Sequence, residues 1–407
     1  MDGLVIGIDL CDTYTHIACS RPEQTWVIPT VVCKNKNQEE WYVDEEAYAH
    51  TLVGDGVMED KLITQVLKDG TATINGIRYE GLYLLKMFLE KALELPKKAA
   101  ETETIASLVI AISSFEVKLM DSLLYCADYL KIPRERVHIV SHTESFVYYV
   151  MSQKRDVWSN QVGMFDLTDE SLRYYELRVQ RMGRQMQVVA DCQNLEEGFH
   201  LDVLENLAGA KLADKILCSC ADRILQKRLF SAILLTGKGF ENTDWAPEFM
   251  KQICSRRRVF VETSLFARGA LMKALDYQQE RSSYPFTCIC EGRLKASVSI
   301  KILSRDKEKP LVLAEAGDNW YEAKSMVDFV VTGTPELEFT VSPLDPRKKK
   351  LVKIPLEGFP KRPDRTTKIQ LSLGFSDEKT MVAVVRDLGF GELFPASDSV
   401  IKQEVML

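Results

Sequence analysis

The sequence predicts an α/β protein of two similar lobes, followed by a C-terminal β-sandwich. Three observations support this fold class. Strand and helix patterns alternate over roughly the first 280 residues, an apolar strand that ends in Asp-Leu occurs twice, and alternating β segments dominate after Pro285. We therefore place one lobe at 1–160, a second lobe at 161–283 and the sandwich at 284–407.

The first lobe contains short apolar runs that predict strands. They cover 4–10, 16–19, 26–33, 107–113 and 137–141. Pro29 indicates an edge strand or a bend. Apolar residues that recur at intervals of three and four predict helices at 79–95, 117–132 and 144–153. This alternation of strands and helices indicates a largely parallel sheet.

The second lobe restarts the same pattern near residue 161. A strand, a polar turn and a second strand occupy 161–180, a third strand follows at 184–192, and a strand at 231–240 ends in glycines. Helices are predicted at roughly 200–208, 210–228 and 264–279. LVIGIDLCDTYTHIA (4–18) and QVGMFDLTDESLRYYEL (161–177) are copies of one motif, and such a repeat predicts two related lobes that face a cleft.

The segment after Pro285 predicts a β-sandwich. Alternating polar and apolar residues occur at 288–303, 325–333, 337–343, 368–375 and 381–389, with turn residues between them. We find no convincing long helix in this region.

Composition and charge narrow the class of protein. The chain has 407 residues, of which 46% are apolar and 27% charged, as is typical of globular proteins. Its formal net charge of -7 argues against nucleic-acid binding. No apolar run approaches 18 residues, and no secretory leader pattern is present at Met1. We therefore expect a cytoplasmic protein with no membrane partner.

The ten cysteines predict reduced, buried thiols. Cys126 and Cys254 both lie in apolar sequence. Two C-x-C pairs, at 218/220 and 288/290, are spaced too tightly for a zinc finger, and no nearby histidine completes either. We favour core thiols over metal ligands for both pairs.

Five segments, taken in order, resemble the actin-like (ribonuclease H-like) ATPase superfamily. The segments are GIDLCDTYT (7–15), LVIAISSF (108–115), RVHIVSHTESFVYYV (136–150), MFDLTDES (164–171) and AILLTGKGF (232–240). The similarity is nearest to the nucleotide-binding domain of the seventy-kilodalton heat-shock chaperones and covers about residues 1–280. It implies ATP or ADP with magnesium in the cleft. It also implies a protein or peptide partner for the C-terminal sandwich, where the chaperones have their substrate-binding β-domain.

The resemblance also assigns residues to the nucleotide site. Asp9 and Asp166 correspond to the acids that orient hydrated magnesium. The other residues that it assigns to nucleotide binding lie in the two phosphate hairpins and in the adenosine loop: Thr13, Tyr14, Thr168, Thr236, Gly237, Lys238 and Gly239.

Both hairpins depart from the family pattern at their glycines. Cys11 and Asp12 replace a glycine and a threonine in the first hairpin, and Thr168, Asp169 and Glu170 replace three glycines in the second. Two like charges at about 4 Å repel each other by roughly 4 kcal/mol at an effective dielectric constant of 20. We therefore expect the added carboxylates to remove most nucleotide affinity, unless the loops point away or a cation bridges them.

The catalytic residues are less well matched. His142 aligns with the family's glutamate, and a shift of two residues would place Glu144 there; either could position an attacking water. The alternative, which we favour, is that His142 caps a helix that begins near Glu144. Lys61 and Lys68 are candidates for the family's catalytic lysine.

The sequence thus predicts a heat-shock-chaperone-like protein with a degenerate nucleotide site that acts mainly through protein binding. The alternative is an active ATPase whose cleft is coupled to the sandwich. A sugar-kinase-like phosphotransferase would need a catalytic aspartate base, and we find no motif for one.

Overall fold

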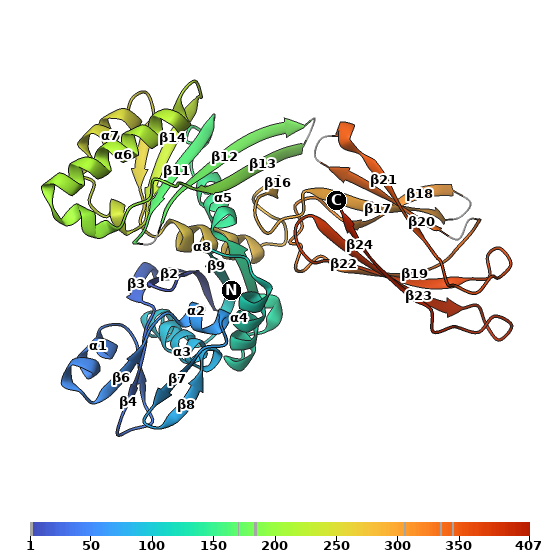
Figure 1. Ribbon diagram of the computed structural model, residues 1–407, viewed down its shortest axis with the longest axis horizontal. Helices are drawn as coiled ribbons and strands as arrows, with labels where there is room; N and C mark the ends of the chain where they lie inside the picture. The colour runs from blue at the N-terminus through green and yellow to red at the C-terminus, as the bar shows by residue number, and fades with distance from the viewer. Residues whose placement is uncertain (1–2, 170, 183–184, 305–306, 334–335, 344–345) are drawn as a thin grey trace. The chain divides into compact units, whose positions relative to one another are not determined.

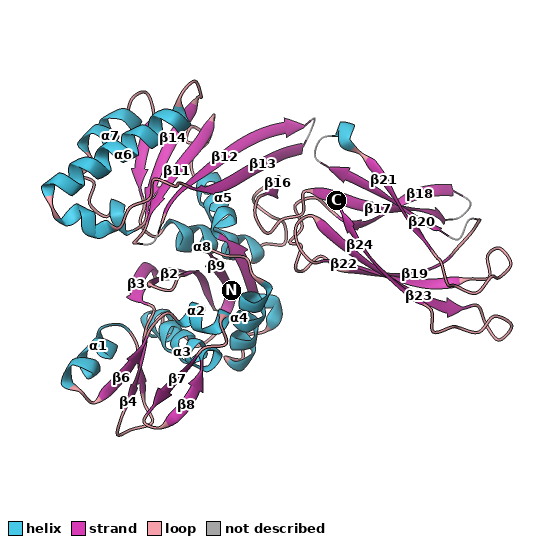
Figure 2. Cartoon of the chain, in the orientation of Figure 1, coloured by secondary structure: helices cyan, strands magenta, loops and turns pink. Residues whose placement is uncertain are grey.

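The computed structural model describes residues 3–169, 171–182, 185–304, 307–333, 336–343 and 346–407. The chain divides into two compact units, Met1–Phe286 and Thr287–Leu407. The sequence placed this boundary between residues 283 and 284. The division falls within the short strand β16 (Phe286–Ile289). Figure 2 shows that helices flank the sheets of the first unit, whereas strands dominate the second.

The first lobe is built on a five-stranded sheet with the order β10-β9-β1-β2-β3. The strands are β1 (Leu4–Leu10), β2 (Tyr14–Ser20), β3 (Glu23–Pro29), β9 (Ile105–Ile112) and β10 (Val137–Ser141). β1, β9 and β10 are parallel, while β2 and β3 are added antiparallel. β3 is an edge strand that ends at Pro29, where the missing N–H group limits further pairing.

In the second lobe, five strands of a six-stranded sheet repeat this arrangement, in the order β15-β14-β11-β12-β13. The strands are β11 (Gln161–Leu167), β12 (Leu172–Met182), β13 (Gln185–Asn194), β14 (Phe230–Thr236) and β15 (Arg258–Val261). β11, β14 and β15 are parallel, and β12 and β13 are antiparallel.

The two copies also share a local irregularity. The register between β1 and β9 shifts between Leu4 and Val5, and the register between β11 and β14 shifts between Gln161 and Val162. Each shift occurs after the first residue of its strand. The repeated sequence motif is therefore a repeat of topology as well, down to the position of a β-bulge.

Helices α5 (His142–Ser152) and α8 (Leu265–Tyr277) lie between the two sheets (Figure 1). The close approach of α8 to β1 and of α8 to α5 depends on two glycines. A Cβ atom on Gly7 would lie 2.2 Å from the Leu271 nitrogen of α8, and one on Gly269 would lie 2.0 Å from the Ser145 carbonyl oxygen of α5. Larger residues at either position would force these elements apart.

Other helices of the first unit cover the sheets or join their strands. They are α3 (Gly81–Ala99), α4 (Val117–Tyr129), α6 (Leu207–Leu225) and α7 (Pro247–Ile253). The helix predicted at 200–208 is instead a short 3₁₀ turn, η2 (Leu201–Glu205). Its five residues give too little length for a stable α-helix.

The segment between β3 and α3 forms small elements, most of which the sequence pattern did not predict. They are β4 (Val32–Asn35), β5 (Trp41–Tyr42), α1 (Asp44–Val53), β6 (Gly56–Glu59), α2 (Leu62–Leu67), β7 (Thr71–Ile74) and β8 (Ile77–Glu80). The single strand predicted at 26–33 is divided between β3 and β4. These elements are too short to show a clear periodicity.

The C-terminal unit contains two four-stranded antiparallel sheets around one core. Their orders are β18-β17-β20-β21 and β19-β22-β23-β24. The strands are β17 (Ala296–Ser304), β18 (Lys307–Ala314), β19 (Ser325–Val330), β20 (Glu336–Pro343), β21 (Lys350–Pro355), β22 (Lys368–Phe375), β23 (Thr380–Gly389) and β24 (Val400–Met406). Residues from both sheets, such as Phe339 and Leu371, share one hydrophobic cluster, as in a β-sandwich.

The cysteines agree with the prediction except at the surface. All ten are free thiols. Cys126, Cys220, Cys288 and Cys290 are buried and Cys218 is half-buried, whereas Cys192 and Cys254 are exposed. Among the described residues, no helix has the length and apolar character needed to cross a membrane.

Candidate functional site

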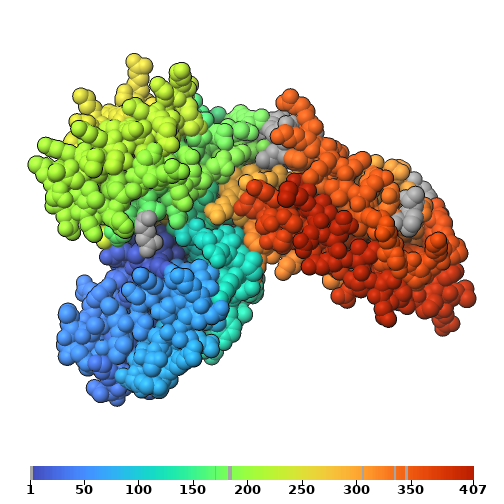
Figure 3. Space-filling view, viewed as in Figure 1, coloured from blue at the N-terminus to red at the C-terminus, as the bar shows by residue number. Residues whose placement is uncertain are grey.

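A cavity of about 230 Å³ lies between the two lobes. Figure 3 shows the hollow between the N-terminal lobe, in blue, and the second lobe, in green. The ends of β1 and β11 face it, which is where parallel α/β sheets commonly bind ligands. Its polar lining includes Asp9, Cys11, Asp12, Thr13, Tyr14, His16, His142, Asp166, Thr168, Asp169, Ser171, Arg173, Thr236, Gly237 and Lys238.

Two buried acids mark corresponding positions in the repeat. Asp9 lies opposite His16 in the β1–β2 pair, and Asp166 lies opposite Arg173 in the β11–β12 pair. Both carboxylates line the cavity. The structure therefore brings the two candidate magnesium-orienting residues to one place.

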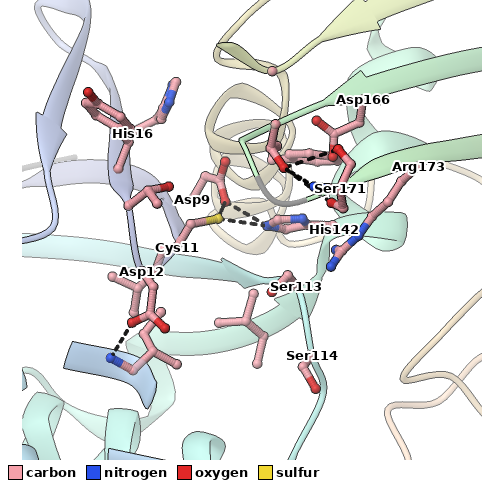
Figure 4. Close-up of a pocket in the computed structure, with 18 of the residues that line it drawn as sticks. Asp9, Cys11, Asp12, His16, Ser113, Ser114, His142, Asp166, Ser171 and Arg173 are labelled. Carbon is pink, nitrogen blue, oxygen red and sulfur yellow. Dashed lines mark hydrogen bonds and ion pairs between the residues drawn. The ribbon is translucent and has the colours of Figure 1, made fainter. Parts of the chain in front are cut away.

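Asp9 belongs to a compact cluster with Cys11 and His142 (Figure 4). The His142 Nε2 atom lies 2.7 Å from Asp9 Oδ1. The Cys11 Sγ atom lies 3.5 Å from the same oxygen and 4.0 Å from His142 Nε2. The imidazole ring stacks on Phe266 with a centroid separation of 4.0 Å, which holds its orientation.

The acids titrate differently because their neighbours differ. Burial favours a raised pKa for Asp9, but the charge and hydrogen bond of His142 offset this and leave the pKa below its usual 3.8. Burial raises the pKa of Asp166 to about 6, although His142 and Arg173 oppose the shift. Burial and the two carboxylates hold the pKa of the Cys11 thiol well above 9.0. Asp9 therefore accepts a hydrogen bond from a protonated Cys11 thiol at neutral pH.

The structure corrects the capping role favoured for His142. Helix α5 begins at His142, and its cap is Ser141, whose Oγ accepts a hydrogen bond from the Glu144 amide at 3.1 Å. The His142 side chain instead enters the cavity. Glu144, the alternative catalytic residue, is buried and is not part of the described cavity lining.

The first hairpin turns its added acid toward a helix. Asp12 Oδ1 accepts hydrogen bonds from the Ile63 amide at 2.8 Å and the Thr64 amide at 3.2 Å, both in α2. This carboxylate therefore caps a remote helix. Thr13 and Tyr14 line the cavity, and the Thr13 carbonyl accepts a hydrogen bond from the Thr30 amide.

The second hairpin has a cation for its added acid. Lys238 Nζ lies 3.1 Å from Asp169 Oδ2 and 5.6 Å from the centre of the Tyr14 ring. The expected repulsion is therefore reduced at both Asp12 and Asp169, while Glu170 lies outside the described residues. The turn also closes on itself, because the Thr168 amide donates to the Ser171 carbonyl at 2.9 Å.

The third loop follows β14. Thr236 is buried, and its hydroxyl donates to the Thr263 carbonyl at 3.4 Å. Gly237 has a φ of 87°, and a Cβ atom there would lie 2.5 Å from the Leu167 carbonyl oxygen. Thr236, Gly237 and Lys238 line the cavity, whereas Gly239 packs against Leu167 outside that lining. Close packing against the end of β11 explains both glycines.

Arg173 is one of the cavity residues that the sequence did not single out. Lys61 and Lys68, the predicted candidates, are exposed and do not belong to the described cavity lining, while Arg173 and Lys238 do. The buried Arg173 Nε and His142 Nδ1 atoms have no hydrogen-bond partner among the described residues. The spacing of the repeat could have identified Arg173, because it follows Asp166 at the same interval as His16 follows Asp9.

Two family profiles together match most of the chain. Residues 13–291 match the C-terminal region of DUF5716, a family of unknown function. Residues 293–407 match DUF8552, a domain of unknown function. No curated protein matches the sequence. Since the first profile covers more than half of the chain, from Thr13 in the first lobe to the end of the second lobe, the protein belongs to the DUF5716 family.

Proposed function

We propose that the first unit has an actin-like fold of the heat-shock-chaperone type with a degenerate nucleotide site, and that the protein acts mainly through protein binding. The duplicated strand order, with matching strand directions and matching bulges, supports this fold. Two such lobes around a cleft provide the architecture in which closure can be coupled to a ligand.

The Asp9–His142 contact is the observation that best supports the proposed loss of ATP hydrolysis. Magnesium prefers oxygen ligands and retains several waters, so a magnesium-orienting acid needs open space in front of it. Here His142 Nε2 lies 2.7 Å from Asp9 Oδ1, and the Cys11 thiol donates a hydrogen bond to the same oxygen. The cavity of about 230 Å³ is also smaller than the roughly 300–1,000 Å³ of common ligand pockets.

The alternative, an active ATPase, has its own support. The added carboxylates of Asp12 and Asp169 are held by α2 and Lys238, so they oppose a polyphosphate less than the sequence suggests. Arg173 Nε and His142 Nδ1 are buried nitrogens that an anionic group could engage. These features favour retained binding of a phosphate-bearing ligand over hydrolysis.

The C-terminal unit offers surfaces suited to a protein or peptide partner. β19 is an edge strand, and its Met326 and Val330 side chains are exposed. An edge strand can accept an extended segment through its unpaired backbone groups, while exposed apolar side chains provide contact area.

Nucleotide binding and hydrolysis should be measured separately. We expect ATP or ADP to produce at most a small thermal shift that does not depend on magnesium, and single-turnover hydrolysis to match the buffer control. A stabilisation of several degrees that requires magnesium, together with hydrolysis lost in Asp166→Asn, would establish the active ATPase instead. Glu241→Gln provides a control for the loss of one negative charge outside the described cavity lining.

A further inference from the structure

We propose that Asp9, Cys11 and His142 form a binding site for one zinc ion, or for another divalent transition-metal ion with similar ligand preferences, in the cavity between the lobes. The three residues supply one oxygen, one sulfur and one nitrogen atom, all within 4.8 Å of one another. This proposal does not rest on nucleotide binding or on its loss.

The spacing of the ligand atoms fits a tetrahedral ion. With zinc–ligand distances of about 2.0–2.3 Å, neighbouring ligand atoms in a tetrahedron lie about 3.3–3.6 Å apart. The observed separations are 2.7 Å between Asp9 and His142, 3.5 Å between Cys11 and Asp9, and 4.0 Å between Cys11 and His142. Movements of about 0.6 Å or less, within the range of side-chain rotation, would bring all three into place.

The fold holds these ligands in position before any ion binds. Asp9 lies in the buried strand β1, and Cys11 follows two residues later, where the chain leaves that strand. His142 comes directly after β10, and its ring is held by stacking on Phe266. The sheet order places β9 between β1 and β10, so the ends of these parallel strands share one edge.

The charges of the site also favour a divalent cation. A carboxylate and a thiolate supply two negative charges, which neutralise the ion, and a neutral imidazole completes the set. Binding would break the Cys11 S–H bond and the N–H bond that His142 Nε2 directs at Asp9. Both protons would leave to solvent, and the two electron pairs would stay on sulfur and Nε2 for the metal bonds. Asp166 lines the same cavity and adds a further negative charge at neutral pH.

The donor set discriminates among metals. Sulfur and imidazole ligands suit zinc and cobalt, whereas magnesium requires oxygen ligands in octahedral geometry. Three protein ligands leave a fourth position for water, as in zinc sites that bind or activate a further ligand. That position would open into the cavity that Arg173 also lines.

The test uses the full chain, stripped of metal under reducing conditions and then titrated with zinc against a chromophoric chelator. We expect one high-affinity equivalent, with the release of protons. Cobalt(II) should produce the visible bands of a tetrahedral ion and a thiolate charge-transfer band. Millimolar magnesium should compete with neither metal. A cobalt spectrum without the thiolate band, or competition by magnesium, would overturn the proposal without any variant.

Variants then locate the site. The loss of a residue that only hydrogen-bonds to a metal ligand already lowers metal affinity by about 10–100-fold. We therefore expect Cys11→Ser and His142→Gln each to weaken zinc binding by at least about tenfold. Cys254→Ser, at an exposed thiol, should bind zinc normally, and so should a Cys288→Ser, Cys290→Ser double variant, which removes two thiols 3.6 Å apart. Unchanged zinc binding in Cys11→Ser, or loss only in the double variant, would overturn the assignment.

Discussion

Two buried acids, one in the cavity and one in the C-terminal unit, illustrate the difference between a candidate site and a structural contact. The Asp387 carboxylate forms a bidentate ion pair with Arg362, at 2.7 Å for both oxygens, and also accepts hydrogen bonds from Gly389 and Ser397. The Asp166 carboxylate has no side-chain hydrogen bond among the described residues. Asp387 is satisfied by the fold, whereas Asp166 is left available to something that enters the cavity.

The pKa shifts follow the same division. The Arg362 guanidinium holds the pKa of Asp387 well below 3.8, with further help from Ser397 and Gly389. Burial raises the pKa of Asp166 to about 6. Ionisation of Asp387 therefore stabilises its unit, and ionisation of Asp166 destabilises the first unit.

The largest expected effect is the loss of the Asp387 partner. Arg362→Met should lower the free energy of unfolding of the C-terminal unit by about 3–5 kcal/mol, because it leaves a buried carboxylate without its cation. Denaturant unfolding that resolves the two units would measure this change. Lys353→Met, which removes a cation from an exposed pair with Glu336, is the matched control and should leave stability nearly unchanged, because solvent screens the pair.

The pH dependence sharpens this prediction. Since the pKa of Asp387 is lower in the folded protein, its contribution is present above pH 3.8 and is lost as the pH falls below that value. The wild-type and Arg362→Met curves should therefore converge in acid. A constant difference down to pH 2 would show that lost packing, not the charge, causes the effect.

An opposite effect is expected at Asp166. Asp166→Asn should increase the free energy of unfolding at pH 7 by up to about 3 kcal/mol, because 1.36 kcal/mol corresponds to each pKa unit. The folded pKa is raised, so wild-type stability should fall as the pH rises from about 3.8 to about 6 and then level off.

Unfolding measured between pH 4 and 7.5 tests this sign. The variant and the wild type should have nearly equal stability at pH 4 and differ most above pH 6. A destabilised variant at pH 7 would mean that ionised Asp166 serves the fold, and the contrast with Asp387 would then be lost.

The smallest effect is expected at the rim of the cavity. Lys238→Ala removes a half-exposed partner of Asp169 and should change stability by less than about 1 kcal/mol, because solvent screens such pairs. The binding free energy of an anionic ligand should fall by more than the free energy of unfolding, since the substitution also leaves the negative charge of Asp169 without its cation. Thermal unfolding with and without ATP separates the two outcomes, and equal losses in both measurements would contradict a role for Lys238 in the cavity.

Much of the architecture could be predicted from local sequence. Continuous apolar runs identified β1, β9 and β10, and the repeated Asp-Leu motif identified the duplicated hairpins. Both features depend on which side chains each strand buries, and this information is local. The small elements between residues 32 and 80 were missed because their stability comes from packing and not from periodicity.

The sequence by itself determined the two-lobed repeat, the all-β character of the C-terminal unit and the positions of Asp9 and Asp166. Only the tertiary structure decided what those acids contact. It brought His142 across the sheet edge to Asp9, directed Asp12 into α2 and paired Lys238 with Asp169. Such contacts join residues far apart in the chain, and their geometry depends on rotamers and strand register that no single segment specifies.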